Sequence, residues 1–304
     1  MSDADTVVLR DLTKRHGPIQ ALDGLSLTVP RGSVTGLLGP NGAGKTTALK
    51  LLLGMARPDG GTGHVFGHRI DVEAESVRIR QRTGYVSETK DLYPHFSVDQ
   101  MIRLTRGLYP SWRPDLERQL RGSFALRPDA KVSTLSKGMR TKLSLLLACC
   151  RGADLLVLDE PTDGLDPVAA ELVLETLIGL VAQDGLTVLV SSHQLAEVER
   201  VADRVVIVDR GQARLEAGLD DLRMRVRRVR IVLDGESSAV AGLRSEPGVL
   251  AVDQSGRVVT LLVDGSAELV IDRARRYAGA ASIETLPVTL RDLFLGLTRR
   301  ADVA

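Results

Sequence analysis

Gly39-Pro40-Asn41-Gly42-Ala43-Gly44-Lys45-Thr46 is the stretch that decides the fold of this 304-residue chain. Residues 33–38, just before it, have the apolar composition of a strand, and residues 46–53, just after it, have the spacing of a helix. A strand that runs through a glycine-rich loop into a helix is the setting of a phosphate-binding loop. This order therefore predicts an α/β fold of the phosphate-loop (P-loop) class.

The residue types of the loop suit a chain of phosphates. Glycines let backbone amides turn inward around phosphate oxygens, and the following helix directs its positive end at the same point. We expect Lys45 to reach the β and γ phosphates, Thr46 to ligate Mg²⁺ and Thr47 to add a phosphate contact. An ordinary glycine turn is the alternative, and the Gly-Lys-Thr-Thr sequence at this offset after a strand argues against it.

Two later apolar runs end in polar side chains. Residues 155–158 lead into Asp159 and Glu160, and residues 187–190 lead through two serines into His193. Such runs are typical of parallel strands that are buried on both faces. We expect Asp159 to hold the Mg²⁺ shell, Glu160 to act as general base and His193 to sense the γ phosphate. A solvated turn and a structural histidine are the alternatives.

Together these segments resemble the ATP-binding cassette family over roughly residues 7–215. The matching elements are the Walker A loop at residues 39–46, Walker B with the catalytic glutamate at 155–160, the D-loop at 164–166, the switch histidine at His193 and the signature, Leu-Ser-Lys-Gly-Met, at 135–139. The resemblance implies a P-loop NTPase fold with a helical subdomain. It also implies an ATPase that converts ATP and water to ADP and phosphate.

The resemblance further implies a head-to-tail dimer with a second ATPase subunit, which is either another copy or a paralogue. Each ATP would lie between the Walker A loop of one chain and the signature of the other. In the signature, Ser136 and Gly138 are the implied contacts to that ATP, and their expected place at the start of a helix suits an anion.

Several positions depart from the family pattern. Lys137 and Met139 replace a glycine and a glutamine in the signature; an altered contact to the opposite ATP and a tolerated surface lysine are both open. His16 stands where the family usually stacks an aromatic ring on adenine, and an imidazole also stacks, over less area. Glu88 stands where a glutamine is usual. We expect Glu88 to ligate Mg²⁺ and to relay the state of the site to the partner subunit; the net effect of its added charge stays open.

The remaining sequence predicts a helical insertion and a C-terminal unit. Apolar residues recur at helical spacing over residues 98–150, inside an ATPase domain that we place at residues 1–215. Short strands are expected at 7–9 and 26–29. Over residues 222–304, strands at 226–233, 249–253, 258–263 and 281–286 alternate with helices at 237–244 and 267–277, before a last helix at 290–299. This β-α-β-β-α-β order predicts a small α+β accessory domain of the ferredoxin-like type.

Bulk properties limit the partners. Lysine and arginine total 40 against 39 aspartates and glutamates, so the chain lacks the positive field of a nucleic-acid-binding protein. No run approaches the roughly 20 apolar residues that span a bilayer, and the acidic first six residues do not suit a secretory signal. We expect a cytoplasmic chain.

Adjacent Cys149 and Cys150, in an apolar helical run, fit reduced core residues better than a disulfide or a zinc site.

The resemblance implies the ATPase subunit of a transporter, most like bacterial exporters, bound to an integral membrane subunit at the inner face of the cell membrane. A cassette that acts on DNA or ribosomes and a regulatory module whose C-terminal unit binds a small ligand are the alternatives. Residues 92–96 fit either a docking surface for a membrane helix or core packing. Arginines between positions 223 and 230, in an alternating pattern, fit either a solvated strand face or a contact to anionic lipid.

Overall fold

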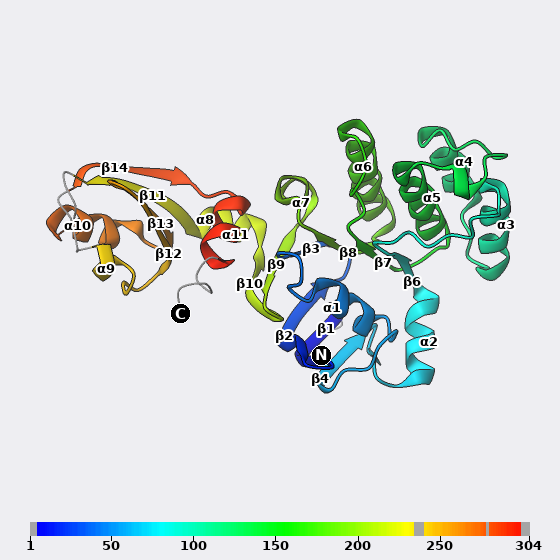
Figure 1. Cartoon of the computed structure of the whole chain (residues 1–304), viewed down its shortest axis with the longest axis horizontal. Coiled ribbons are helices and arrows are strands. Elements are labelled where there is room, and N and C mark those ends of the chain that lie inside the picture. Colours follow the sequence, from blue (N-terminus) through cyan, green and yellow to red (C-terminus); the bar gives the residue numbers. More distant parts are fainter. Residues whose placement is uncertain (1–4, 234–239, 278–279, 299–304) are drawn as a thin grey trace. The chain divides into compact units, whose positions relative to one another are not determined.

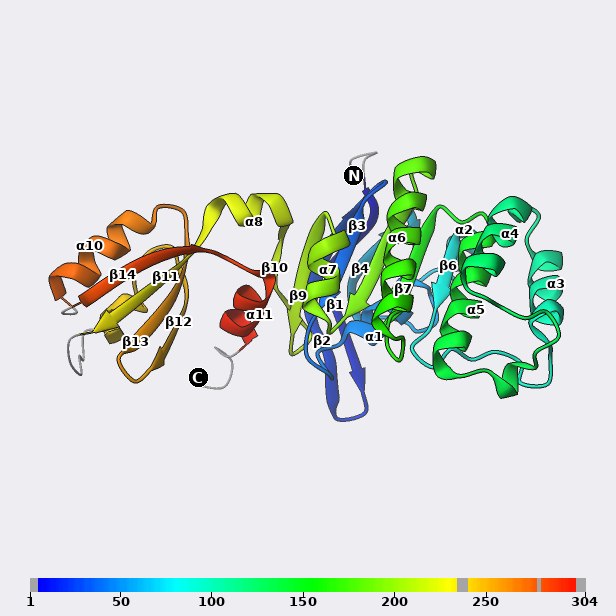
Figure 2. The same cartoon turned by 90° about the horizontal axis from the view of Figure 1, so that it is seen from above.

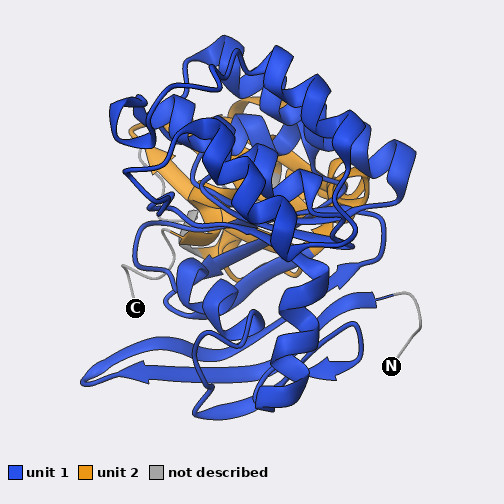
Figure 3. Ribbon diagram, turned by 90° about the vertical axis from the view of Figure 1, so that its right-hand side faces the viewer, with its two compact units in different colours: residues 1–216 blue, residues 217–304 orange. Residues whose placement is uncertain are grey.

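The computed structural model describes residues 5–233, 240–277 and 280–298 (Figure 1). The chain divides into two compact units, Met1–Glu216 and Ala217–Ala304, which are coloured separately in Figure 3. The first unit is α/β and the second is a small α+β fold, so the predicted fold class is confirmed. In the described ranges, no helix has both the length and the apolar character required to cross a membrane.

A six-stranded sheet with the order β10-β9-β3-β8-β7-β6 forms the centre of the first unit. Its strands are β3 (Val34–Leu38), β6 (Thr83–Val86), β7 (Leu155–Asp159), β8 (Thr187–Ser192), β9 (Arg204–Asp209) and β10 (Gln212–Gly218). β3 pairs in parallel with β8 and β9, and β7 pairs in parallel with β6 and β8. Their carboxyl ends therefore meet at one edge, where Leu38 lies opposite Ser192 and Asp159 lies opposite Ser191.

The central strands are apolar throughout because their alternate residues belong to different hydrophobic cores. Leu156 and Leu158 pack with α5 (Lys137–Cys150) and α6 (Pro167–Asp184) on one face. Leu155 and Val157 pack on the other face, with α1 (Lys45–Leu52) and the second sheet. Figure 1 shows α6 above the strands and α1 below them, and in Figure 2, which is seen from above, α6 lies in front of the strands. Successive side chains of a strand point to opposite faces of the sheet. When both faces are covered, every residue of the strand is buried, and the strand is therefore apolar along its whole length.

The second sheet, of order β2-β1-β4-β5, consists of β1 (Asp5–His16), β2 (Ile19–Pro30), β4 (Gly60–Val65) and β5 (His68–Arg69). β1 and β2 form an antiparallel hairpin of two 12-residue strands, so the short strands predicted at 7–9 and 26–29 are much too short. Irregularities in the register, such as the one between Leu9 and Leu12, interrupt the alternation that the prediction needed.

The helical part of the first unit contains α3 (Val98–Leu108), α4 (Pro114–Ser123), a 3₁₀ turn at Val132–Thr134 and α5; α2 (Glu73–Arg82) precedes it and α7 (Leu195–Val201) follows β8. Cys149 and Cys150 are buried and free in α5, as predicted, and burial raises the pKa of Cys149 to about 12. In the 92–96 segment, Leu92 and Phe96 pack against the core while Tyr93 is 60% exposed.

The C-terminal unit is a four-stranded sheet of order β12-β13-β11-β14. Its elements are α8 (Leu219–Arg225), β11 (Val226–Leu233), α9 (Val240–Leu243), β12 (Val249–Ser255), β13 (Val258–Asp264), α10 (Ala267–Tyr277), β14 (Ala280–Pro287) and α11 (Leu290–Thr298). All its strand pairs are antiparallel, which is the split βαβ arrangement. Of the predicted helices, residues 237–239 and 299 lie outside the described residues.

The arginines of positions 223 to 230 do not share one strand face. Arg223 and Arg225 lie in α8, so the alternating strand predicted for them is wrong. Arg225 contacts both carboxylate oxygens of Asp264, at 3.1 and 2.6 Å, and Arg228 contacts Asp292 at 3.0 Å. Arg223 contacts Asp220 at 3.3 Å, so these three arginines are each bound by a carboxylate of their own unit.

Candidate active site

A cavity of about 550 Å³ opens at the carboxyl edge of the six-stranded sheet. The phosphate loop lines it from Pro40 to Thr47, and Glu88, Asp159, Glu160 and His193 lie around it. These residues come from the ends of neighbouring parallel strands, which is why segments far apart in sequence meet here. The structure thus brings together most of the binding and catalytic residues that we predicted.

The phosphate loop needs glycine where it passes close to other backbone. A Cβ atom on Gly39 would lie 2.4 Å from the Val208 carbonyl oxygen, a distance that no real side chain tolerates. Gly44, the residue before α1, has a φ of 104°, which favours glycine. The loop therefore leads directly from β3 into the first turn of α1, whose amide groups are suited to an anion.

Lys45 is buried at the base of this loop. Its Nζ donates hydrogen bonds to the Gly39 carbonyl at 2.7 Å and the Pro40 carbonyl at 3.3 Å, and it lies 3.8 Å from Glu160 Oε1. Burial lowers the pKa of Lys45, and the charges of Glu160, Asp159 and Glu88 oppose that shift. A phosphate chain in the cavity would give this ammonium the close counter-charge that carbonyl groups supply only in part.

The two carboxylate oxygens of Asp159 differ in their hydrogen bonding. Its Oδ1 accepts a hydrogen bond from the Ser191 hydroxyl at 2.5 Å, while Oδ2 is buried and has no hydrogen-bond partner in the described part of the chain. A buried carboxylate oxygen without a partner is costly unless a cation neutralises it. With the Thr46 hydroxyl and the Glu88 carboxylate in the same cavity, the donors fit a small oxygen-loving cation such as Mg²⁺.

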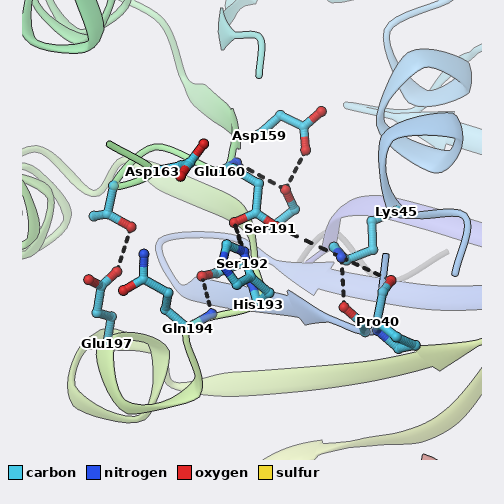
Figure 4. A network of polar contacts seen from close by, with 12 residues as sticks. Pro40, Lys45, Asp159, Glu160, Asp163, Ser191, Ser192, His193, Gln194 and Glu197 are labelled. Carbon is cyan, nitrogen blue, oxygen red and sulfur yellow. Dashed lines mark hydrogen bonds and ion pairs between the residues drawn. The ribbon is translucent and has the colours of Figure 1, made fainter. Parts of the chain in front are cut away.

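Glu160 is held by its backbone and by its carboxylate (Figure 4). Its φ of 50° is left-handed, which is uncommon for a residue with a side chain. The amide of Glu160 donates to the Ser191 carbonyl and hydroxyl, both at 3.2 Å. Its Oε2 lies 2.8 Å from His193 Nδ1. The carboxylate is thereby fixed between an imidazole and the ammonium of Lys45.

His16 is not among the residues that line the cavity. It is exposed at the end of the β1–β2 hairpin, and its backbone pairs with that of Ile19. Ile19, which is 66% exposed, and Ala21 line the cavity instead. Sequence reasoning missed both; their separation by two residues, which puts them on one face of β2, was the available signal.

Ser136 and Gly138 of the signature also lie outside the residues that line the cavity. Ser136 is the N-cap of α5, and its hydroxyl accepts a hydrogen bond from the Met139 amide at 3.2 Å, so the predicted position at a helix start is correct. The Lys137 ammonium lies 2.6 Å from Asp163 Oδ2, and this hydrogen bond lowers the pKa of Asp163. The signature therefore contacts the D-loop region of its own chain.

Comparisons with known proteins agree with this geometry. The sequence model of a family described as ABC transporter matches residues 22–163. The chain is 36% identical over 301 residues to Nod factor export ATP-binding protein I of Burkholderia orbicola (strain AU 1054), covering 96% of each chain. It is 34% identical over 303 residues to daunorubicin/doxorubicin resistance ATP-binding protein DrrA of Streptomyces peucetius, covering 94% of this chain and 90% of that one.

A solved structure described as the ATP binding subunit of an ABC transporter has a similar fold, with a TM-score of 0.66 and 31% identity. The similarity covers 72% of this chain and 92% of that one. The two sequence relatives, in contrast, extend over nearly the whole length of this chain.

Proposed function

The chain belongs to the ATP-binding cassette transporter family, and from this premise we propose that it hydrolyses ATP to drive export through a separate membrane subunit. The observation that carries the proposal is the meeting of Lys45, Asp159, Glu160 and His193 around one cavity at the edge of the parallel sheet. A phosphate-binding ammonium, a free carboxylate oxygen and a second, fixed carboxylate are the groups that ATP hydrolysis requires.

In the proposed reaction, the phosphates of ATP lie along the loop amides and against Lys45. Mg²⁺, held by Thr46, Asp159 and Glu88, would neutralise phosphate charge when bound. Glu160 orients a water molecule and accepts its proton while the water oxygen attacks the γ phosphorus in line. The bond between the γ phosphorus and the bridging oxygen breaks, which releases ADP and inorganic phosphate. His193 keeps the Glu160 carboxylate in place.

We also propose that the site is completed by a second ATPase subunit, either another copy or a paralogue. Ser136 and Gly138 do not line the cavity of their own chain, which supports a role toward the ATP of a partner. The dimer closes only if ATP binds the closed arrangement more tightly than the open one. ATP binding would then close the dimer, and hydrolysis would open it.

The membrane partner and the cellular location are further parts of the proposal. The names of the two relatives concern export of Nod factor and resistance to daunorubicin and doxorubicin. By analogy, we propose that this chain lies at the inner face of the cell membrane, bound to an integral membrane subunit that selects the exported compound. Tyr93, 60% exposed beside the partly buried Phe96, is available for that contact.

Affinity purification from solubilised membranes tests the choice of partner. We expect an integral membrane protein to copurify with the tagged chain in a comparable amount. Recovery of ribosomes or DNA would instead support the alternative in which the cassette acts on nucleic-acid assemblies, and would contradict transport. Recovery of the chain alone, with a small ligand bound to residues 217–304, would support a regulatory module.

Glu88 is expected to contribute an oxygen ligand to the cation. Glu88→Ala should lower ATP turnover about tenfold, the effect of losing one charge-assisted contact of roughly 1.5 kcal/mol. Glu88→Gln keeps an oxygen at the same position and should lose less. Phosphate release with increasing Mg²⁺ measures both variants. Unchanged turnover and transport in Glu88→Ala would show that the carboxylate has no part in the site.

A further inference from the structure

Lys90 is a buried lysine that the proposed reaction does not use. It lies in the loop after β6, close in sequence to Glu88, and only 5% of it is exposed. Its Nζ donates hydrogen bonds to the Asp159 carbonyl at 3.1 Å and to the Glu160 carbonyl at 3.0 Å. The side chain therefore connects this loop to the backbone of the two carboxylates in the cavity.

The carbonyl groups that Lys90 contacts belong to residues 159–163, which we call the catalytic turn, and this turn contains a strained residue. Glu160 has a left-handed φ of 50°, a conformation that costs about 1–3 kcal/mol in a residue other than glycine and persists only when its surroundings hold it. Within the described ranges, the Glu160 carbonyl accepts one backbone hydrogen bond, from the Asp163 amide at 3.3 Å. The ammonium is the only charged donor that the described residues direct at this carbonyl.

The charge of Lys90 indicates that this side chain does more than fill space in the interior. A buried ammonium costs free energy unless polar partners repay it, and an apolar side chain would fill the same volume without that cost. The partners here are carbonyl oxygens of the catalytic turn, so the turn is the feature that a lysine stabilises better than an apolar residue.

A second lysine holds the other end of the same turn. Lys137 contacts the Asp163 side chain at 2.6 Å, whereas Lys90 contacts the backbone of Asp159 and Glu160. Of these two lysines, Lys90 alone contacts Glu160 in the part of the chain that the structure describes. The two lysines therefore have separable roles.

We propose that Lys90 is a positioning residue for Glu160. Its ammonium fixes the left-handed backbone of Glu160, so that the carboxylate remains 2.8 Å from His193 and on the side of the cavity that contains Lys45. Lys90 does not line the cavity and has no contact with the nucleotide in this proposal. The inference rests on the proposed role of Glu160 as general base.

Lys90→Met tests the inference, because methionine keeps most of the buried stem and removes every donor. Since a small misplacement of a reacting group costs up to about a hundredfold in rate, we expect kcat to fall about tenfold to a hundredfold. The dissociation constant for ATP should stay within about threefold, because the loop and Lys45 are untouched. Lys90→Arg, which keeps the donors, should recover part of kcat. Lys50→Met, at an exposed lysine of α1, is the matched control and should behave as wild type.

The Glu160→Gln background separates positioning from general support of the fold. If Lys90 acts through Glu160, Lys90→Met should lower single-turnover hydrolysis far less in that background than in wild type. Equal losses in both backgrounds, a kcat that Lys90→Met leaves unchanged, or a matching loss of ATP affinity would each overturn the inference. Wild type without ATP hydrolysis would instead overturn the proposed function, so the two failures are distinguishable.

Discussion

Glu160→Gln is expected to lower ATP turnover by about 10²- to 10⁴-fold, the usual contribution of a general base, while ATP binding is retained. Glutamine keeps the shape and one carbonyl oxygen, and the backbone contacts of residue 160 to Ser191 do not involve the side chain. What is lost is the group that accepts the proton of water. Phosphate release and equilibrium binding of ATP measure the two quantities separately.

Glu197→Gln is the matched control for this change. Glu197 accepts a hydrogen bond from the Thr162 hydroxyl at 2.5 Å and does not line the cavity, so the same substitution there should leave turnover close to wild type. Because bound ATP is no longer consumed, Glu160→Gln should also accumulate a closed dimer in size-exclusion chromatography with ATP. A Glu160→Gln protein with normal turnover would remove Glu160 as the base.

Lys45→Ala should have the opposite phenotype, a loss of nucleotide affinity. Hydrogen bonds to a charged group contribute about 1.5–3 kcal/mol, so the dissociation constant for ATP should rise about 10- to 150-fold. The substitution also removes the positive partner 3.8 Å from Glu160, which leaves the carboxylates of the cavity without this counter-charge. Calorimetric titration with ATP measures this change in the dissociation constant.

Lys50→Ala is the control for that titration, because Lys50 lies in the same helix and is exposed. Its affinity should equal that of wild type. If Lys45→Ala bound ATP as well as Lys50→Ala did, the phosphates could not lie against Lys45. Turnover at saturating ATP would then show whether Lys45 acts in the chemical step alone.

The fold and the centre of the site were predictable because both depend on parallel strands. Each apolar run is buried on both faces, and each ends in the polar residue that the cavity needs: the phosphate loop after Leu38, Asp159 and Glu160 after Leu158, and His193 after Ser192. Once the strands are parallel and adjacent, their ends must meet. At these positions, the local sequence was therefore enough to predict which distant residues meet in the cavity.

Other features depend on contacts that no local pattern records. The hairpin register, which places Ile19 rather than His16 at the cavity, follows from where the turn at Gly17 occurs and from irregular pairing. The contacts of Lys90 join residues 69 and 70 positions apart in sequence. In the sequence, Lys90 resembles any loop lysine, and only its burial against Glu160 distinguishes it.

Phosphate release from ATP and Mg²⁺ by the purified chain, measured over a range of chain concentrations, tests the central claim most directly. We predict hydrolysis whose rate per chain rises with concentration to a plateau, as expected of a site completed by a second subunit, and that is lost in Glu160→Gln. No phosphate release at any concentration, or release that Glu160→Gln leaves intact, would contradict an ATPase site at the edge of this sheet. A rate per chain that is independent of concentration down to the lowest measurable level, with no dimer present, would contradict the shared site.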